Sequence, residues 1–277
     1  MHRPRLGLTY LPGQNNRMRK RGRKGSSFAR SETYGRITVP AGAEAEKTVR
    51  AAVVVAAGSA TRMEGIDKVL TPLADVPVLV RTLRVFQNCD DIDEIVVVTR
   101  EDLLVEVSQL CKAFALDKVS KVVVGGKERI NSVLCGLREV RQDAELIAIQ
   151  DGARPFLTQE VLGEVLEKAE ATGAAAPAIP VTDTIKRVEN GLAVETPDRS
   201  SLFAVQTPQV FEAGLIRAAV EKAVEEGVTL TDDCAAVERL GMKVSLTQGS
   251  RENIKITTPL DLFLGEAILD ARDGRVL

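Results

Sequence analysis

Residues 51–70 read AAVVVAAGSATRMEGIDKVL, and this stretch decides the fold class of the chain. It opens with a continuous apolar run, residues 51–57, that is rich in β-branched valine. A run of this length that ends at a glycine is typical of an interior strand of a parallel sheet, buried on both faces. Gly58 then begins a loop of small residues. Open α/β folds bind nucleotides at such loops, at the carboxyl ends of their strands.

The loop after this strand has a composition suited to phosphate binding. Small side chains at residues 58–61 let a phosphate approach backbone N–H groups, and Arg62 and Lys68 add positive charge beside it. The loop has neither the Lys-Ser/Thr ending of a P-loop nor the GxGxxG pattern of dinucleotide-binding folds. Taken alone, it is compatible with a nucleotide site and equally with a glycine turn that binds nothing.

The composition excludes several other classes of protein. Hydrophobic residues make up 44% of the 277 residues, as in an ordinary globular protein. No stretch reaches the roughly 18 apolar residues that a membrane span needs. The four cysteines, Cys89, Cys111, Cys135 and Cys234, lie far apart and form no CxxC pair. We expect buried, reduced thiols in a cytoplasmic protein rather than a disulfide framework or a zinc site.

The histidine content limits the chemistry further. His2 is the single histidine of the sequence, which excludes Ser-His-Asp catalysis, Cys-His catalysis and histidine-ligated metals. A bound metal would have oxygen ligands, and this favours Mg²⁺. Catalysis would depend on Arg, Lys and carboxylate side chains.

Charge is distributed unevenly along the chain. Residues 1–50 contain twelve Lys and Arg against three Glu, a net charge of +9, so the rest of the chain carries −11 to give the overall −2. We interpret residues 1–48 as a basic, disordered extension and residues 49–277 as one domain. The alternatives for the acid-free first 30 residues are a nucleic-acid-binding tail and an Arg/Ser-rich transit peptide.

Strand and helix patterns alternate through this domain. Expected strands lie at residues 51–57, 94–99, 121–124, 146–150, 174–179 and 243–246. Expected helices lie at residues 76–86, 101–114, 130–140, 158–172, 212–226 and 231–240, and a last one begins at Thr258-Pro259. Alternation with short connections predicts an α/β fold with a mostly parallel, doubly wound sheet and right-handed crossovers.

The alternation breaks between residues 181 and 211. Two short β-prone runs, residues 184–188 and 192–195, flank Asn190-Gly191, which is a strong signal for a two-residue hairpin turn. A hairpin inserted in a parallel α/β domain has no core of its own. We therefore expect it to project as an arm and pack on a second subunit. The alternative is that it covers one end of its own sheet.

Charged and glycine residues collect where the expected strands end. Those that follow the strands are Arg62 and Lys68; Gly125, Gly126, Arg129 and Ser132; Asp151 and Arg154; and Glu252 and Lys255. Because the carboxyl ends of parallel strands share one edge of a sheet, these groups should converge on one cleft. The set is cationic with one or two carboxylates, which suits phosphoryl or nucleotidyl transfer assisted by an oxygen-ligated metal.

Longer motifs carry a family resemblance. The chain contains, in this order between residues 56 and 262, the segments AAGSATRM, DKVL, GGKERINSV, QDGARPF, TDTIK, DRSSLFAVQTPQVF, TDDCAAVE and NIKITTPLDL. Together they resemble the 2-C-methyl-D-erythritol 4-phosphate cytidylyltransferases of the non-mevalonate isoprenoid pathway. The resemblance covers essentially everything after the extension. Ala60 and Lys127 depart from the residues usual in that family.

The resemblance implies a Rossmann-like nucleotidyltransferase fold and a homodimer with exchanged β-arms. It also implies a Mg²⁺-dependent reaction in which CTP and the methylerythritol phosphate give the CDP-alcohol and pyrophosphate. The implied nucleotide-binding residues are Ala56, Ala57, Gly58, Gly126, Arg129 and Ser132. The implied catalytic residues are Arg62, Lys68, Arg199 and Lys255, and the implied substrate-binding residues are Arg154, Thr184, Arg199 and Lys255. Asp151 matches the metal ligand, and Glu252 is a further metal-ligand hypothesis.

Other functions share parts of this pattern. A ribitol 5-phosphate cytidylyltransferase would grip a different polyol phosphate with the same core. A non-catalytic nucleotide-binding protein of the same fold would not need Arg62, Lys68, Asp151 and Lys255 together. Nucleic-acid binding through residues 1–30 is the least favoured partner hypothesis, and no membrane partner is expected.

Overall fold

The computed structural model describes residues 48–58 and 67–275, within a compact unit that begins at Glu46. Residues 1–47, most of the predicted extension, lie outside the described residues, as do Ala60 and Arg62. The strands are β1 (Arg50–Val55), β2 (Pro72–Leu73), β3 (Val76–Pro77), β4 (Glu94–Thr99), β5 (Val119–Val124), β6 (Leu146–Asp151), β7 (Ala174–Pro180), β8 (Arg187–Glu189), β9 (Leu192–Glu195), β10 (Phe203–Val205), β11 (Gln209–Glu212) and β12 (Ser245–Gln248). The helices are α1 (Val78–Gln87), α2 (Leu104–Ala113), α3 (Arg129–Glu139), α4 (Gln159–Thr172), α5 (Ala213–Glu225), α6 (Cys234–Arg239) and α7 (Pro259–Arg272), with 3-10 turns η1 (Glu101–Leu103) and η2 (Arg199–Ser201).

The central sheet has the strand order β10-β7-β11-β6-β1-β4-β5, and β12 pairs with β7 beside this path. Strands β6, β1, β4 and β5 are parallel, so that Val53 lies between Val96 and Ile149 in the register. β12 runs parallel to β7, whereas β10 and β11 are antiparallel to their neighbours. The mostly parallel, doubly wound sheet expected from the sequence is confirmed.

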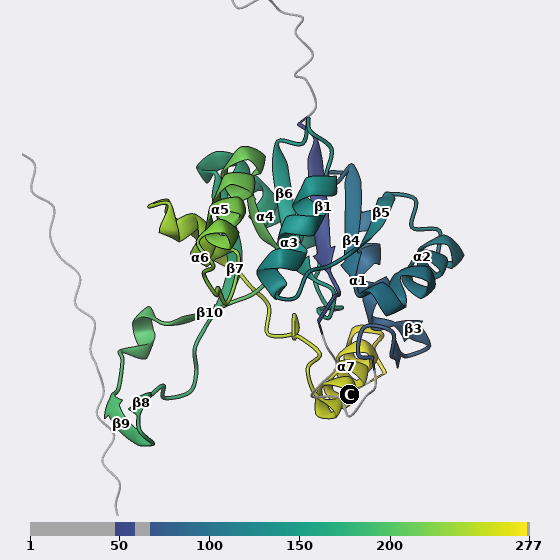
Figure 1. Ribbon diagram of the computed structural model, residues 1–277. Coiled ribbons are helices and arrows are strands. Elements are labelled where there is room, and N and C mark those ends of the chain that lie inside the picture. The colour runs from purple at the N-terminus through teal and green to yellow at the C-terminus, as the bar shows by residue number, and fades with distance from the viewer. Residues whose placement is uncertain (1–47, 59–66, 276–277) are drawn as a thin grey trace, which may run out of the picture. The chain divides into compact units, whose positions relative to one another are not determined.

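After Arg50, strand β1 is apolar because helices cover both faces of the sheet (Figure 1). Ala52 and Val54 face a core that includes side chains of α1, α2 and α4. Ala51 and Val53 face the other core, with side chains of α3, α5 and α6. All four are fully buried. A Cβ at Gly136 of α3 would lie 2.4 Å from Val53 Cγ1, so this glycine lets the helix pack directly on the strand.

Two strands lie where the sequence predicted none, between the hairpin and α5. β10 and β11 are short, three and four residues, and β11 takes its hydrogen bonds from both β6 and β7. Such strands depend on partners far away in the sequence, which local patterns do not reveal. Helix α6 is shorter than the predicted 231–240, because the Asp232 side chain accepts a hydrogen bond from Ala235 N at 3.0 Å.

The predicted hairpin is present as β8 and β9. Figure 1 shows it away from the sheet, at the end of two connecting segments of the chain. Asn190 and Gly191 at its tip both have positive φ, 51° and 80°, as a type I′ turn requires. Every residue of β8 and β9 is exposed, including Val188 and Leu192. The hairpin therefore contributes almost nothing to the core of the domain.

Among the described residues, every helix is too short or too polar to pass through a lipid bilayer.

Candidate active site

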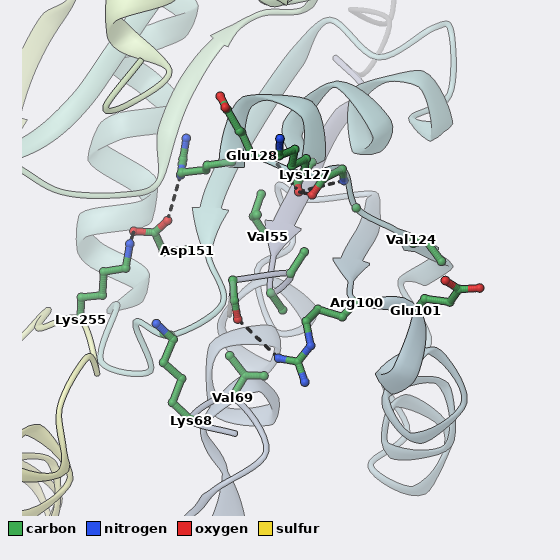
Figure 2. A pocket seen from close by; sticks show the side chains of 18 residues that line it. Val55, Lys68, Val69, Arg100, Glu101, Val124, Lys127, Glu128, Asp151 and Lys255 are labelled. Atoms are coloured by element: carbon green, nitrogen blue, oxygen red, sulfur yellow. Dashed lines mark hydrogen bonds and ion pairs between the residues drawn. The ribbon is translucent and has the colours of Figure 1, made fainter. Parts of the chain in front are cut away.

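A pocket of about 620 Å³ opens at the carboxyl edge of the parallel strands. Figure 2 shows side chains from several loops turned toward it. The residues in its lining that the sequence had singled out are Ala56, Ala57, Gly58, Lys68, Gly125, Gly126, Arg129, Ser132, Asp151 and Lys255. The pocket also includes Lys127. The expected convergence of strand ends on one cleft thus holds for these residues.

One wall of the pocket is built by backbone that follows β1, β4 and β5. Ala56 N donates to Val98 O at 2.7 Å, and Gly125 N donates to Thr99 O at 2.8 Å. A Cβ at Gly125 would lie 2.7 Å from the Ala57 Cβ and 2.6 Å from Ser132 Oγ. Glycine at this position is therefore needed for the two loops to approach each other.

Helix α3 begins at this wall. Glu128 and Asn131 form a capping box, in which each side chain accepts a hydrogen bond from the backbone of the other residue. Ser132 Oγ accepts a hydrogen bond from Gly126 N at 3.1 Å and lies 3.2 Å from Glu128 O, to which it donates. The Gly-Gly turn and the first helical turn are thus fixed to each other. A helix N-terminus beside a pocket favours an anionic ligand.

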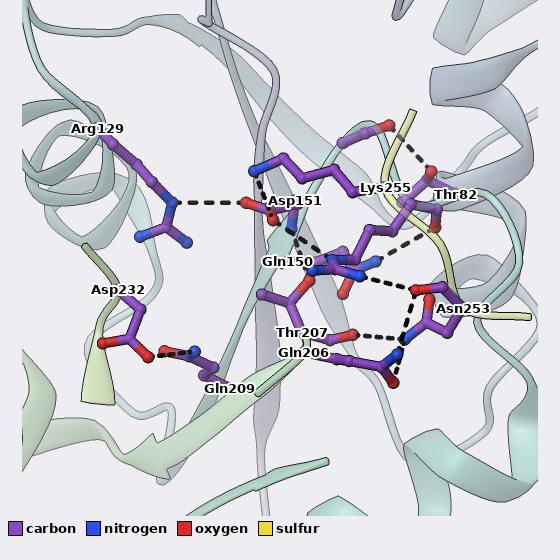
Figure 3. Close-up of polar contacts among 12 residues, drawn as sticks. Thr82, Arg129, Gln150, Asp151, Gln206, Thr207, Gln209, Asp232, Asn253 and Lys255 are labelled. Carbon is purple, nitrogen blue, oxygen red and sulfur yellow. Dashed lines mark hydrogen bonds and ion pairs between the residues drawn. The ribbon is translucent and has the colours of Figure 1, made fainter. Parts of the chain in front are cut away.

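Asp151, the last residue of β6, carries a cluster of cations (Figure 3). Its Oδ2 lies 2.9 Å from Lys255 Nζ and 3.5 Å from Arg154 Nε, and its Oδ1 lies 3.4 Å from Arg129 Nε. Burial by itself would raise the pKa of Asp151, but the charges of Arg129, Lys255 and Arg154 lower it to about 2. Asp151 is therefore ionised at neutral pH.

Arg129 is shared between two carboxylates. Its Nη1 and Nη2 donate to Asp233 Oδ1 and Oδ2 at 2.8 and 2.7 Å, while its Nε faces Asp151. Burial alone would lower the pKa of Arg129, but Asp233 and Asp151 raise it above its ordinary value. Burial raises the pKa of Asp233, and the Arg129 charge opposes that rise. Because a guanidinium stays protonated, the half-buried Arg129 forms an ion pair with the buried Asp233.

The segment 206–209 ties the loops of the pocket together (Figure 3). Thr207 Oγ1 accepts a hydrogen bond from Asp151 N at 3.1 Å, and Thr207 O accepts one from Asn253 Nδ2 at 3.0 Å. Gln206 Nε2 donates to Ser250 O at 2.8 Å. Gln209 Oε1 accepts from the backbone N of Asp233 and of the next residue, both at 2.9 Å. Motifs that are far apart in the sequence therefore form one polar network.

Arg100 is a pocket residue that the sequence analysis missed. It follows β4 directly, so the same strand-end rule that singled out the other cations applies to it. Its Nη2 lies 2.7 Å from Asp67 Oδ2, and its Nη1 donates to Gly58 O at 3.5 Å. Asp102 binds the other side of the guanidinium, with two contacts of 3.0 Å. Arg100 thus connects Gly58, in the loop after β1, to the turn that carries Lys68.

Several predicted residues are placed elsewhere. Arg154 lies behind Asp151, where its Nη1 donates to Asn253 O at 2.7 Å, and it is absent from the pocket lining. Thr184 and Arg199 lie on the exposed arm, where Arg199 Nη1 donates to Thr182 O at 2.8 Å. Glu252 is paired with Arg272 at 2.9 Å, away from Asp151. Arg62 lies outside the described residues.

The donors for a metal ion are sparse. Within residues 48–58 and 67–275, no group of three or more His, Cys, Asp or Glu side chains is arranged to hold one. Asp151 is the ionised carboxylate of the cation cluster and it lines the pocket. A single carboxylate suits Mg²⁺ when substrate phosphates and water supply the remaining ligands, as is usual for this ion.

Comparison with known proteins gives a consistent result. The family model described as 2-C-methyl-D-erythritol 4-phosphate cytidylyltransferase matches residues 50–271. The chain is similar to proteins of that name from Caldanaerobacter subterraneus (46% identity over 225 residues, 79% of this chain and 97% of the relative) and from Halalkalibacterium halodurans (43% over 224 residues, 80% and 98%).

Solved structures agree with the fold. The crystal structure of 4-diphosphocytidyl-2C-methyl-D-erythritol synthase from Anaerococcus prevotii matches with a TM-score of 0.73 and 28% identity, over 81% of this chain and 97% of that one. The 2-C-methyl-D-erythritol 4-phosphate cytidylyltransferase from Thermus thermophilus matches with a TM-score of 0.64 and 29% identity, over 78% and 97%.

Proposed function

The chain belongs to the 2-C-methyl-D-erythritol 4-phosphate cytidylyltransferase family, and from this we propose that the pocket at the carboxyl edge of its sheet is the catalytic site. The enzyme is a nucleotidyltransferase that transfers CMP from CTP to 2-C-methyl-D-erythritol 4-phosphate and releases pyrophosphate. The observation that supports this location of the catalytic site is the convergence of Lys68, Arg129, Asp151 and Lys255 on one pocket.

We assign the two halves of the pocket to the two substrates. Ala56, Ala57 and Gly58 lie on the same wall as Gly126 and Ser132, and these small side chains leave room for the cytidine and the phosphates of CTP. Lys255 and Asp151 form the other half, where the polyol phosphate would bind beside the Lys255 amino group. Arg154, behind Asp151, holds that carboxylate from the far side.

The chemistry needs little from the protein besides charge. An oxygen of the substrate phosphate attacks the α-phosphorus of CTP in line, and a new P–O bond forms. The bond from the α-phosphorus to the oxygen that bridges to the β-phosphate breaks, and pyrophosphate leaves with the electron pair. Because the attacking oxygen is already an anion, no general base is required. The cations Lys68 and Lys255, together with Arg62 by its place in the motif, would stabilise the negative charge that gathers on the α-phosphate.

Asp151 would hold Mg²⁺ in this mechanism. The bound ion would neutralise phosphate charge and help to orient the triphosphate. The carboxylate fits this role because it is ionised, at the pocket, and near enough to the proposed phosphate positions that their oxygens would complete the ligand set. Glu252 lies on Arg272 instead, so we assign it no part in metal binding.

A homodimer with exchanged arms would complete the site. The arm exposes Ile185, Val188, Leu192, Val194, Phe203 and Val205, an unusual apolar surface for a segment without a core. Thr184 and Arg199 lie on that arm and would reach the polyol phosphate in the partner subunit. Support for this arrangement comes from the exposure of the arm and from the family membership.

A reducing compartment such as the cytoplasm suits the cysteines. All four are free thiols in the described chain, and Cys89, Cys111 and Cys234 are buried.

The direct test is pyrophosphate release from CTP with each of two acceptors, with and without Mg²⁺. Turnover with the methylerythritol phosphate is expected, and it should disappear when the ion is chelated. Turnover with ribitol 5-phosphate alone would reject the substrate assignment in favour of the alternative considered from the sequence. Tight CTP binding with no turnover on either acceptor would indicate a non-catalytic nucleotide-binding protein.

A further inference from the structure

Asp233 holds a pocket residue without lining the pocket itself. Its side chain is 2% exposed, and its two oxygens take both terminal nitrogens of Arg129 at 2.7 and 2.8 Å. A two-bond pair of this kind fixes the plane of a guanidinium as well as its position. Arg129 therefore cannot turn without breaking both bonds in a buried place, where an unpaired charge is costly.

The contacts of the terminal nitrogens of Arg129 with Asp233 determine which atom of Arg129 faces Asp151. With Nη1 and Nη2 committed to Asp233, the Nε side faces Asp151, and the contact is a long one of 3.4 Å. The closer partner of Asp151 is Lys255, at 2.9 Å. Charges of alternating sign thus run in the order Lys255, Asp151, Arg129, Asp233, from the polyol-phosphate half of the pocket to a carboxylate behind its lining.

A single short segment places both carboxylates of this row. Thr207 binds the backbone N of Asp151, and Gln209, two residues further on, binds the backbone N of Asp233. Gln209 is 2% exposed, and its Nε2 also donates to Asp232 Oδ2 at 3.0 Å. The spacing between the two acidic side chains is therefore set by the backbone that leads into β11, and Arg129 fits between them.

We propose that Asp233 is a positioning residue for the reaction: it holds Arg129 by both terminal nitrogens and so keeps that side chain from displacing Lys255 on Asp151. The inference rests on the function proposed above. Without the Asp233 carboxylate, the guanidinium turns its two-nitrogen end to Asp151, the acid that remains. The cations around Asp151 and the nucleotide-binding half of the pocket then both lose their geometry. Such a misplacement of catalytic groups costs about a hundredfold in rate.

The test is a double-mutant cycle on the full-length chain, made from the wild type, Asp233→Asn, Arg129→Met and the double variant. Asp233→Asn should lower kcat/KM for CTP about a hundredfold. In the Arg129→Met background, the same change should have no further effect on kcat/KM. Glu238→Gln removes an exposed negative charge from α6, the helix that begins directly after Asp233, and is the matched control. It should behave as the wild type.

A purely structural role makes a different prediction. Equal losses of kcat/KM in the two backgrounds, or a lowered melting temperature with unchanged kcat/KM, would overturn the inference. If Asp233→Asn does not fold, the comparison of Arg129→Met with the double variant still decides, because the double variant lacks both buried charges. A double variant that is much less active than Arg129→Met would contradict the proposal.

Calorimetric titration of the same four proteins with CTP measures their CTP affinities and completes the cycle without turnover. Loss of CTP affinity in Asp233→Asn, absent in the Arg129→Met background, supports the role of Asp233. Affinities that change equally in both backgrounds reject it. An inactive wild type that binds CTP would reject the proposed reaction, so the two failures are told apart.

Discussion

The amino group of Lys255 lies 2.9 Å from Asp151 Oδ2, and this contact joins the loop before α7 to the end of β6. Lys255 is still 37% exposed, so its charge is available to a ligand in the pocket. Lys255→Ala should therefore remove most turnover while the fold persists. Loss of one preorganised donor costs about 3–4 kcal/mol of transition-state stabilisation, a hundred- to thousandfold in kcat. Steady-state pyrophosphate release measures this, and circular dichroism checks the fold.

Lys243→Ala is the control for that change, since it removes an exposed lysine that precedes β12. Its activity should equal that of the wild type. Near-normal turnover of Lys255→Ala would remove the role that we assign to this amino group.

Asp151 should dominate the acid sensitivity of the folded state. Its pKa is about 2 in the fold, against an ordinary value of 3.8. Because the folded pKa is the lower one, ionised Asp151 stabilises the fold fully above about pH 4, and this contribution is lost as the pH falls toward 2. The loss is on the order of 2 kcal/mol. Urea unfolding at several pH values should show it in the wild type.

Asp151→Asn should reduce the loss of stability between about pH 4 and pH 2. It should also lower stability near neutral pH, because Arg129, Arg154 and Lys255 then repel one another without a counter-charge. The exposed Asp90 provides the control, and Asp90→Asn should retain the wild-type pH dependence. If Asp151→Asn loses as much stability between about pH 4 and pH 2 as the wild type does, other carboxylates control acid unfolding.

Arg100 should matter for rate although it is not a predicted catalytic residue. It binds Asp67, whose carbonyl oxygen accepts hydrogen bonds from Thr71 N at 3.0 Å and Thr71 Oγ1 at 2.9 Å, so the turn that contains Lys68 depends on this anchor. Arg100→Leu should lower kcat between about tenfold and a hundredfold, with a smaller change in the melting temperature than a core substitution causes.

Asp67→Asn should give a loss of the same size as Arg100→Leu, and the double variant should be no worse than either. Asp102→Ala leaves the contact between Arg100 and Asp67 in place and should cost little, because Asp102 is an exposed partner. Additive losses from Arg100 and Asp67 would show that they do not act through one contact.

Mixed subunits test the exchange of arms. Lys68→Ala should inactivate the site on its own core, and Arg199→Ala should inactivate the site on the partner's core. In a symmetric dimer with exchanged arms, each mixed dimer then contains one site with neither substitution. Mixing the two inactive proteins after dissociation should restore part of the activity, measured as pyrophosphate release. If no activity returns in verified mixed dimers, both residues belong to one subunit's site.

The sequence was sufficient to predict those site residues whose place follows from their position at the end of a strand. The apolar run after Arg50 and the glycine at 58 predicted β1 and its loop, and the same reasoning placed Asp151 and Lys255 at the same edge of the sheet. It was insufficient for contacts made between distant loops. Asp233 follows no strand, and nothing local to it reveals that a half-buried guanidinium 104 residues earlier needs its carboxylate.

Glu252 illustrates the same limit for a side chain near the site. The sequence offered it as a metal-ligand hypothesis, and in the structure its side chain turns to Arg272 at the end of α7, which also donates to Phe156 O at 2.9 Å. The partner that captures this glutamate comes from a helix whose docking is a tertiary event. Spacing along the chain cannot show which way such a side chain turns.

The division of β1 between two cores has a consequence for inheritance. Neighbouring residues from Ala51 to Val54 face opposite layers, and the period of a strand is two residues. Exchange of one aliphatic side chain for another changes only local packing. Insertion or deletion of one codon turns every later side chain of the strand to the wrong layer and moves Gly58 away from the pocket. Descendants of this sequence should therefore vary freely in which aliphatic residues fill β1, while the length of the strand stays constant.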